Sequence, residues 1–583
     1  MIKRILYKSD DCIFRVGVVI IMMLTTIMAV EIRWSECEIR IFYGIPLLLI
    51  LGFALLIWKK QRLHITLTDT LATGWLFYYI GRAWIGNEWP CQMEFLKTVE
   101  LFSLYLSLRI AFSGTKLSAW VLIGCVLIFG CYEAGLGASQ LFGDGISRHY
   151  LYSISGNFIN PGPYSAYLMI GVTIGLVAIK EVPSQAIISA MPKFVPAKIS
   201  DSLKTITWEH LLIIAVTVMA IPLPATWSRA AFLGLSVVLL FVYKEKYWKY
   251  RYIVWGCILL AGIAFYFIKQ GSADGRVIIW RSALTTWTHC PWLGVGIGGF
   301  FNAFAEGTAL LSVTDADFSS AGVPDGAYNN FVRIIVEQGV VGGLLAIGFT
   351  ISAMIKLSKN SKPIFYGIMA LLVFSMFSYP FDLMPYKVIV VMTIAWSESI
   401  ENKRVIEIGP VLVFILGCLL SLTCWYAGKK ANESFMRDQE LETGRSFWNF
   451  CSNENAYEWL TSERDNHEFL FSFGKMLREE GRYNDSNDIL RQGTRCSADP
   501  MFYVLMGNNY KDLKHYDLSE QAYQKAFSIM PNRLYPLYQL MMLYHDSGNK
   551  QKAKEMAKRV IEMKPKIESP ATKDMKKKAE EIL

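Results

Sequence analysis

Three arginines stand out because they lie beside long apolar segments. Arg229 follows an apolar run in PATWSRAAFLGL, and Arg276 and Arg281 lie in GRVIIWRSALTTW, within a polar stretch between two apolar segments. A charged side chain costs about 2 to 3 kcal/mol deep in a bilayer, so it usually has a partner. The planar guanidinium group suits phosphate oxygens. Without a matching set of acids, these arginines indicate an anionic lipid headgroup or a diphosphate as ligand, while anchoring at the membrane surface is an equal alternative for any one of them.

The elements that must position these arginines are membrane-spanning helices. The chain has 583 residues, of which 53% are hydrophobic and only 18% are charged. The apolar residues gather in blocks of roughly 17 to 25, long enough to cross a bilayer. We therefore expect an all-α fold, a polytopic membrane helix bundle with about thirteen spans. The predicted spans lie near residues 14–31, 42–58, 66–84, 96–112, 118–137, 162–180, 209–224, 230–243, 252–268, 330–355, 364–380, 386–399 and 408–426.

Lysines and arginines in alternate short loops predict the orientation of the bundle. The N-terminal MIKRILYK, the loop at 244–251 and the pair at 403–404 are all basic and fall on one side. The positive-inside rule places that side in the cytoplasm. The three arginines, a large loop at about 269–329 and everything after about residue 427 are then periplasmic. The net charge of +9 is explained by this topology and a basic tail, and does not indicate a nucleic-acid partner.

The C-terminal part of the chain repeats with a period of 34 residues. Tyr510 and Tyr544, and likewise Pro531 and Pro565, are one period apart. This period and its aromatic and proline positions are typical of tetratricopeptide repeats. After the membrane domain at 1–426, we expect a linker with first helices at 427–466 and a helical solenoid at 467–583. Its concave surface would bind a peptide, a glycan or a protein partner, the alternative being an appendage that only stabilises the fold.

Four motifs in the membrane part carry a family resemblance. GNFINPGPYSAYL, WSRAAFLGL, GRVIIWRSALTTWTHCPWLGVGIGGF and AYNNFVRIIVEQGVVGG occur in this order between residues 156 and 343. The chain resembles the O-antigen ligase family, which also contains O-antigen polymerases and bacterial O-linked oligosaccharyltransferases. The resemblance covers roughly residues 120 to 400. Oligosaccharyltransferases of this group often carry a periplasmic tetratricopeptide tail, which agrees with the repeats found here.

The resemblance implies transfer of a glycan from a polyprenyl diphosphate carrier to a glycan, lipid or protein acceptor. The fold would be of the lipid-donor glycosyltransferase type, in the bacterial inner membrane. Arg229 and Arg276 match family arginines and, with Arg281, would bind the donor diphosphate and stabilise it as a leaving group. The resemblance implies no metal and no cofactor, and the expected partners are the lipid-linked glycan, the bilayer and a protein on the repeats.

The chain departs from the family at Tyr328, where many members have a histidine before an asparagine. A tyrosine, with an ordinary pKa of about 10, is a poor general base at neutral pH. Either its hydroxyl orients the donor or acceptor, or another group takes the proton, with Asp325 the nearest carboxylate and His149 and His289 as further candidates.

Three more residues are expected to shape the site. Asn160 would break a helix at its edge and contact the donor, Asn329 follows Tyr328 in the motif, and Glu337 matches an acidic residue of the family. Glu337 lies four residues after Arg333, so the two side chains can pair on one helix face.

Two other functions remain possible from the sequence. A polymerase that joins polysaccharide repeat units would share the same membrane core. A transporter or scaffold without enzymatic activity is the other alternative, although the spans contain no inverted repeat of broken helices and no chain of acidic residues.

Overall fold

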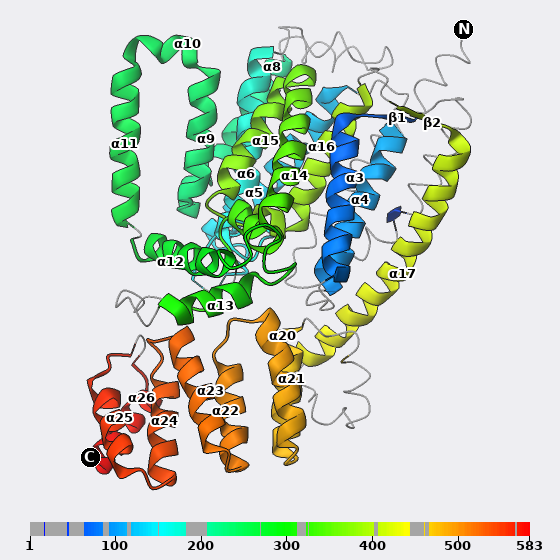
Figure 1. The fold of residues 1–583 in the computed structure, drawn as a ribbon. Helices are drawn as coiled ribbons and strands as arrows, with labels where there is room; N and C mark the ends of the chain where they lie inside the picture. Colours follow the sequence, from blue (N-terminus) through cyan, green and yellow to red (C-terminus); the bar gives the residue numbers. More distant parts are fainter. Residues whose placement is uncertain are drawn as a thin grey trace.

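The computed structural model describes residues 17, 44–45, 63–85, 92–112, 118–149, 151–181, 207–268, 270–311, 322–324, 326–400, 406–442, 460, 466–565 and 568–583. Within these ranges the helices and the loops between them are accompanied by one short pair of strands. Figure 1 shows two parts, a helix bundle that contains both strands and a smaller helical domain at one end of it. Helix α17, which is 33 residues long, runs down one side of the bundle toward the smaller domain.

The bundle contains eleven long helices within the described ranges, and each overlaps one of the predicted spans. These are α3 (Leu67–Ile85), α4 (Gln92–Phe112), α5 (Ala119–Phe142), α6 (Pro161–Glu181), α8 (Trp208–Ala220), α9 (Arg229–Val242), α11 (Arg251–Ile268), α14 (Asn330–Asn360), α15 (Lys362–Ser375), α16 (Met384–Ile400) and α17 (Pro410–Glu442). Short turns of helix connect them: η2 (Pro224–Thr226), α10 (Lys244–Tyr247), η3 (Trp248–Tyr250) and η5 (Pro380–Asp382).

Four segments of the described residues are long and apolar enough to cross a membrane: Ala119–Phe142, Pro161–Glu181, Trp208–Thr226 and Asn330–Asn360. Helices α9 and α15 are apolar but shorter. The first two predicted spans, 14–31 and 42–58, lie almost entirely outside the described residues. The number of about thirteen spans is therefore not confirmed, whereas the all-α class and the helical repeats are.

Helix α6 lies at the centre of the bundle and packs against α5, α8, α9 and α15. Close packing depends on its glycines. A Cβ on Gly171 would lie 2.5 Å from the sulfur of Met219, and one on Gly175 would lie 2.4 Å from a methyl group of Val216. Small residues let helices approach closely in membrane bundles, where packing replaces the hydrophobic effect as the driving force. This close packing holds α6, and with it the first turn of the helix, in position against its neighbours.

The two strands close the opposite end of the bundle. β1 (Leu63–Ile65) pairs antiparallel with β2 (Ile406–Ile408), with His64 opposite Glu407. Beside them the buried Arg109 forms an ion pair with Asp69, whose Oδ2 lies 2.8 Å from its Nη2. The same nitrogen donates to the backbone oxygen of His64 at 2.8 Å. This network joins α3 and α4 to the strands and lies far from the smaller domain (Figure 1).

The segment predicted as a loop at about 269–329 contains two helices, α12 (Gln270–Trp287) and α13 (Phe300–Leu311). Both lie across the end of the bundle, between it and the smaller domain (Figure 1). They cross so closely that a Cβ on Gly307 would lie 1.8 Å from the backbone oxygen of Ser282. The hydroxyl of Thr308 also donates to that of Ser282 at 3.0 Å. Helices α12 and α13 therefore form one tightly packed pair.

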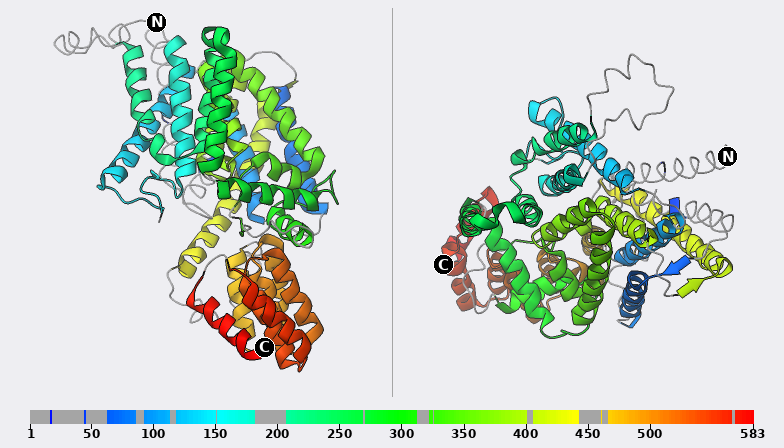
Figure 2. Two further views of the ribbon diagram at one scale, coloured as in Figure 1. Left: turned by 90° about the vertical axis from the view of Figure 1, so that its left-hand side faces the viewer. Right: turned by 90° about the horizontal axis from the view of Figure 1, so that it is seen from above.

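The smaller domain is an array of antiparallel helices (Figure 2). Its helices are α20 (His467–Glu479), α21 (Tyr483–Cys496), α22 (Met501–Asp512), α23 (Tyr516–Ile529), α24 (Leu534–Asp546), α25 (Lys550–Glu562) and α26 (Pro570–Ile582). Within a pair, Gly507 of α22 lies against the ring of Tyr523 of α23, where a Cβ would come within 2.5 Å. Tyr544 and Ala553, both repeat positions, are buried in the next pair. The first of these helices, α20, begins at His467.

Candidate active site

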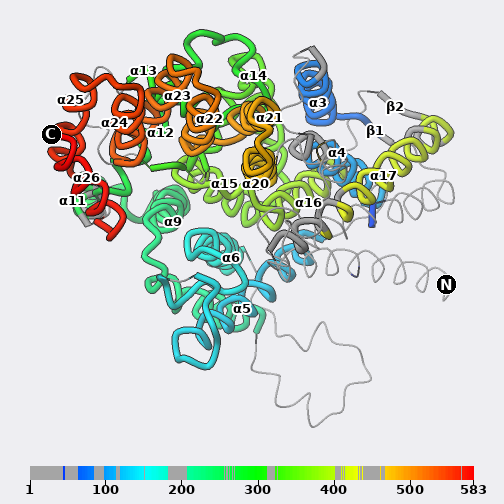
Figure 3. Tube along the Cα trace, turned by 90° about the horizontal axis from the view of Figure 1, so that it is seen from below, coloured from blue at the N-terminus to red at the C-terminus, as the bar shows by residue number. Residues whose placement is uncertain are grey.

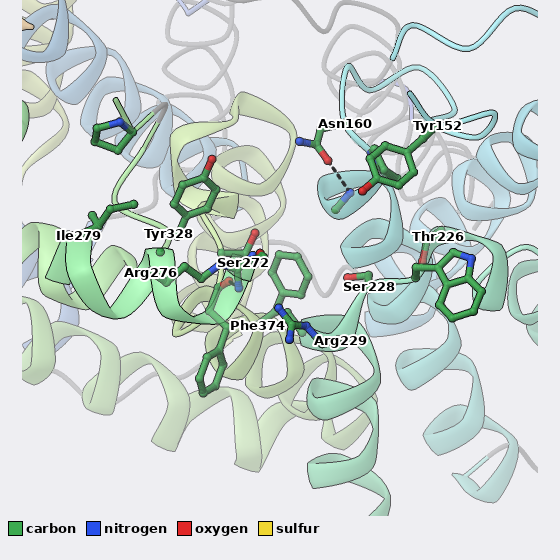
Figure 4. A pocket seen from close by; sticks show the side chains of 18 of the residues that line it. Tyr152, Asn160, Thr226, Ser228, Arg229, Ser272, Arg276, Ile279, Tyr328 and Phe374 are labelled. Atoms are coloured by element: carbon green, nitrogen blue, oxygen red, sulfur yellow. Dashed lines mark hydrogen bonds between the residues drawn. The ribbon is translucent and has the colours of Figure 1, made fainter. Parts of the chain in front are cut away.

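A cavity of about 370 Å³ lies at the end of the bundle that faces the repeats. Its walls come from five parts of the chain: the start of α6 with the loop before it, the turn from η2 into α9, one face of α12, residues 322–324 with Tyr328, and the end of α15. Figure 4 shows the side chains that line it. The fold thus brings parts of all four sequence motifs to one end of the bundle.

Arg229 is the first residue of α9 and lines the cavity. The preceding Ser228 caps the helix, its side-chain oxygen accepting a hydrogen bond from the backbone N–H of Ala231 at 3.4 Å. Trp227 before it has a left-handed backbone with φ of 50°, a conformation that costs energy for a residue with a bulky side chain. The chain turns sharply here, which places Arg229 at the helix N-terminus rather than within the span.

Arg276 reaches the same cavity from α12 (Figure 4). Its Nη1 donates to the backbone oxygen of Phe377 at 2.7 Å. Its guanidinium carbon lies 5.2 Å from the centre of the Tyr328 ring, a distance at which a cation and an aromatic face attract each other. Burial lowers the pKa of Arg276, and the charge of Arg229 lowers it further. The two arginines are therefore close enough to repel one another, and a shared anion would relieve that repulsion.

Tyr328 is held by its backbone and by its ring. It has a left-handed backbone with φ of 50°, and the indole N–H of Trp280 donates to the oxygen of Ala327 just before it at 2.8 Å. Its ring meets that of Tyr379 edge to face, with ring centres 5.5 Å apart. Strained backbone of this kind persists only where the surroundings hold it, and it often occurs at functional sites.

Two helices direct their N-termini at the cavity. The Oδ1 atom of Asn160, just before α6, accepts a hydrogen bond from the N–H of Gly162 at 3.0 Å, and α9 begins at Arg229. Helix N-termini carry partial positive charge and suit anions. No aspartate or glutamate is among the described residues that line the cavity. The described wall therefore combines two arginines, two helix N-termini and the hydroxyls of Ser228 and Ser272.

Other residues predicted from the sequence lie elsewhere. Arg281 is exposed and is not part of the cavity wall, because five residues of α-helix turn it about 140° away from Arg276. Asn329 caps α14, its Oδ1 accepting hydrogen bonds from the N–H groups of Phe331 and Val332 at 3.0 and 3.1 Å. Asp325 lies outside the described residues.

Glu337 takes part in a chain of ionic contacts beside the cavity. Its carboxylate binds Arg333 at 3.1 Å, and Arg333 also binds Asp382 at 2.9 Å. The predicted pairing of Arg333 with Glu337 is thus present. Asp382, which the sequence analysis missed, follows the cavity residues Phe377 and Ser378 and ties the end of α15 to α14.

The two histidine candidates differ in their position relative to the cavity. The ring of His149 lies 4.8 Å from that of Tyr152, which lines the cavity. His289 is exposed in the turn after α12. Neither histidine is part of the cavity wall.

A buried carboxylate positions the loop that leads into α6. Glu133 accepts two hydrogen bonds from Asn157, from its side-chain nitrogen at 2.8 Å and from its backbone N–H at 3.1 Å. Gln140 forms three more with Ser155 and Gly156 of the same loop, including one from the N–H of Gly156 at 2.9 Å. Both lie on α5, and the only sequence signal for Glu133 was a lone acid within an apolar span.

Helix α14 has a break, and the loop that follows α12 packs against it. Gly339 has φ of 66° and ψ of −169° inside this helix. The loop at 291–296 fills the break: the N–H of Gly296 donates to the oxygen of Glu337 at 3.0 Å, and that of Val340 donates to the oxygen of Pro291 at 2.9 Å. The backbones of Gly294 and Gly339 are in contact. A Cβ on either glycine would lie within 2.6 Å of the backbone of the other segment. The glycines therefore make a backbone joint.

Comparison with known proteins identifies two regions of the chain. The O-antigen ligase family model matches residues 214–347, which include α9, α12, α13 and most of the cavity wall. Residues 214–347 match an O-antigen ligase domain. The tetratricopeptide repeat model matches residues 502–533 and 536–567. The family resemblance seen in the motifs is thereby confirmed, as is the repeat domain.

The O-antigen ligase domain indicates a bacterial membrane protein with a glycan-transfer function, for which glycan and lipid substrates are expected; the repeats indicate protein interaction. No curated protein matches the chain significantly. Among solved structures, the crystal structure of MamA protein is 19% identical over 22% of this chain and 74% of that chain, with a TM-score of 0.18. So low a TM-score adds nothing to the description of the fold.

Proposed function

We propose that the protein transfers a glycan from a polyprenyl diphosphate carrier to an acceptor at the periplasmic face of the bacterial inner membrane. The observation that supports this most is the pair of arginines, Arg229 and Arg276, which share one cavity with two helix N-termini at the end of the bundle. A diphosphate carries about two charges and has the bidentate oxygens that guanidinium groups recognise. The two guanidinium groups and the two helix N-termini of the cavity suit a diphosphate.

The proposed reaction is a displacement at the anomeric carbon. The oxygen of an acceptor hydroxyl bonds to that carbon while the bond to the diphosphate oxygen breaks, and the diphosphate leaves with the electron pair. Negative charge on the leaving oxygens grows in the transition state, so fixed guanidinium groups lower the barrier. Arg229 and Arg276 supply this stabilisation. Arg276 is held in place by the oxygen of Phe377 and the ring of Tyr328.

Tyr328 acts chiefly through its ring in this proposal. The ring contacts the guanidinium group, and the hydroxyl orients the donor or acceptor, which agrees with the poor basicity of a phenol. We assign removal of the acceptor proton to Asp325, the carboxylate nearest to Tyr328 in the sequence. Asn160 would contact the donor from the start of α6.

The proposed topology places α12, α13 and the repeats in the periplasm. The cavity and the repeats share one end of the bundle, and the basic turn at α10 lies at the other (Figure 1). This arrangement supports the proposed sidedness, with α10 on the cytoplasmic side. About thirteen spans and a cytoplasmic N-terminus are part of the same proposal. The repeats would then hold a protein partner, either the acceptor or a protein that delivers it.

Cells that produce variants of this chain test the proposal. Arg229→Ala and Arg276→Ala should each abolish most glycan transfer, and lipid-linked glycan should accumulate. Analysis of glycoproteins, surface lipid-linked polysaccharide and polysaccharide chain length in a deletion strain identifies the acceptor class, and a change confined to chain length would favour the polymerase. Normal transfer by both arginine variants would overturn the diphosphate assignment.

A further inference from the structure

We propose that the tetratricopeptide domain is a positioning element of the donor cavity, in addition to any role in binding a partner. Its α23 and the junction between α21 and α22 hold α12 and α13, and through them Arg276 and Tyr328. The inference rests on the proposed function of the cavity. It adds that donor binding depends on a domain of which no described residue lines the cavity.

One apolar cluster joins the two domains. Helix α13 packs against both α21 and α23, and Figure 3 shows the repeats lying under α12 and α13 with α5 and α6 to one side. The repeats contribute Ala498, Ile529 and Met530 to the cluster, and the other side contributes Ile279, Phe300 and Phe304. All six side chains are buried. Burial of this many apolar groups is the main force that holds such a contact together.

An ion pair fixes the alignment of the contact. The Nζ atom of Lys525 on α23 lies 2.6 Å from Oε2 of Glu306 on α13, and their side chains are 29% and 39% exposed. A partly exposed pair contributes little stability by itself. Reversing one of its charges, however, places two like charges against each other at the edge of the cluster.

The cluster continues into the cavity wall. Ile279, Val323 and Tyr328 line the cavity and also belong to, or pack against, the cluster. Ile279 lies one turn after Arg276 on α12 and therefore on nearly the same face. Because α12 and α13 are locked together at Gly307 and Ser282, a shift of α13 must move α12 and the arginine on it.

The two possible roles of the repeats make different predictions. If they only bind an acceptor, loosening their contact with α13 changes acceptor use and leaves donor affinity unchanged. If they position the cavity, donor affinity falls even when no acceptor is present. A donor probe that lacks a glycan, such as farnesyl diphosphate, separates these effects.

The experiment uses the full chain in detergent, with Glu306→Lys, Lys525→Glu and the double variant that restores opposite charges. Lys554→Glu, on an exposed face of α25, is the matched control. We measure binding of farnesyl diphosphate and hydrogen–deuterium exchange of α12 and α13. Each single reversal should weaken binding about three- to tenfold and raise exchange in α12 and α13, the double variant should recover both, and the control should match the wild type.

Two results would overturn the proposal: unchanged exchange in both single variants, or raised exchange with wild-type binding of the probe. A wild-type protein that does not bind farnesyl diphosphate would instead contradict the donor assignment. In that event, raised exchange at 276–279 in the single variants and its recovery in the double variant would still support the coupling between the domains.

Discussion

The guanidinium group of Arg276 lies against the ring of Tyr328, 5.2 Å from its centre, and both side chains face the same cavity. This contact suggests a role for the ring of Tyr328 in holding Arg276, whereas its phenol is a poor general base. The aromatic face keeps the guanidinium group oriented while its remaining donors stay available for a ligand.

Removal of either cavity arginine should reduce glycan transfer about 100-fold, since each one stabilises charge that grows on the leaving diphosphate. Arg276→Lys should recover only part of the loss, because an ammonium group cannot make the paired bonds of a guanidinium. Rates of transfer in membranes check this. The matched control is Arg251→Ala at the start of α11, which should stay within about twofold of the wild type, and an equally large loss there would point to a general effect of removing arginine.

Replacement of Tyr328 separates its ring from its hydroxyl. Tyr328→Phe should keep transfer within about threefold, because the ring still holds Arg276, whereas Tyr328→Ala should lose at least about tenfold. Farnesyl diphosphate binding by both variants identifies the step affected. Equal losses in the two variants would show that the hydroxyl itself takes part in the reaction.

Gly339→Ala should destabilise the protein by about 1 to 3 kcal/mol, because residue 339 has φ of 66° and a Cβ would lie 2.3 Å from the oxygen of Trp292. Thermal unfolding in detergent measures the change. Gly348→Ala on the same helix is the control: its Cβ would meet nothing closer than 3.7 Å, so alanine should be neutral or slightly stabilising. A neutral Gly339→Ala would mean that the backbone joint between α14 and the 291–296 loop is not needed.

The repeats should lose stability in acid. Burial would raise the pKa of Asp546, but its ion pair with Lys511, 2.6 Å long, and its contact with His545 outweigh this and lower the pKa. A lowered pKa in the folded state stabilises the fold at pH values above the pKa of the unfolded state, about 3.9. This stabilisation is lost as the pH falls through the pKa of the folded state. Asp546→Asn should therefore unfold at a lower temperature at pH 7, and the difference should shrink below about pH 4.

Calorimetry of the full chain checks this, with Asp488→Asn on an exposed part of α21 as the control. If the unfolding temperature of Asp546→Asn stays below that of the wild type in acid, the loss of stability has a cause other than the charge of Asp546.

The sequence by itself determined the long helices of the bundle, although not α12 and α13, which lie in a segment predicted as a loop. Apolar blocks of this length can satisfy their own backbone groups in a bilayer as helices, and each predicted span within the described ranges overlaps a helix. The repeats were equally clear, because a fixed period and its small and aromatic positions reflect contacts between neighbouring helices. The motifs also singled out Arg229, Arg276 and Tyr328.

Only the tertiary structure decided which of these residues share a cavity. Arg276 and Arg281 lie in one motif and were both expected to bind the diphosphate, yet the turn of α12 places Arg276 in the cavity wall and exposes Arg281. The break at Gly339 and the docking of Met530 near α13 depend on partners about 45 and 220 residues away in the chain. Contacts over such distances leave no local pattern, because periodicity records which face of a helix is apolar and not which helix will cover it.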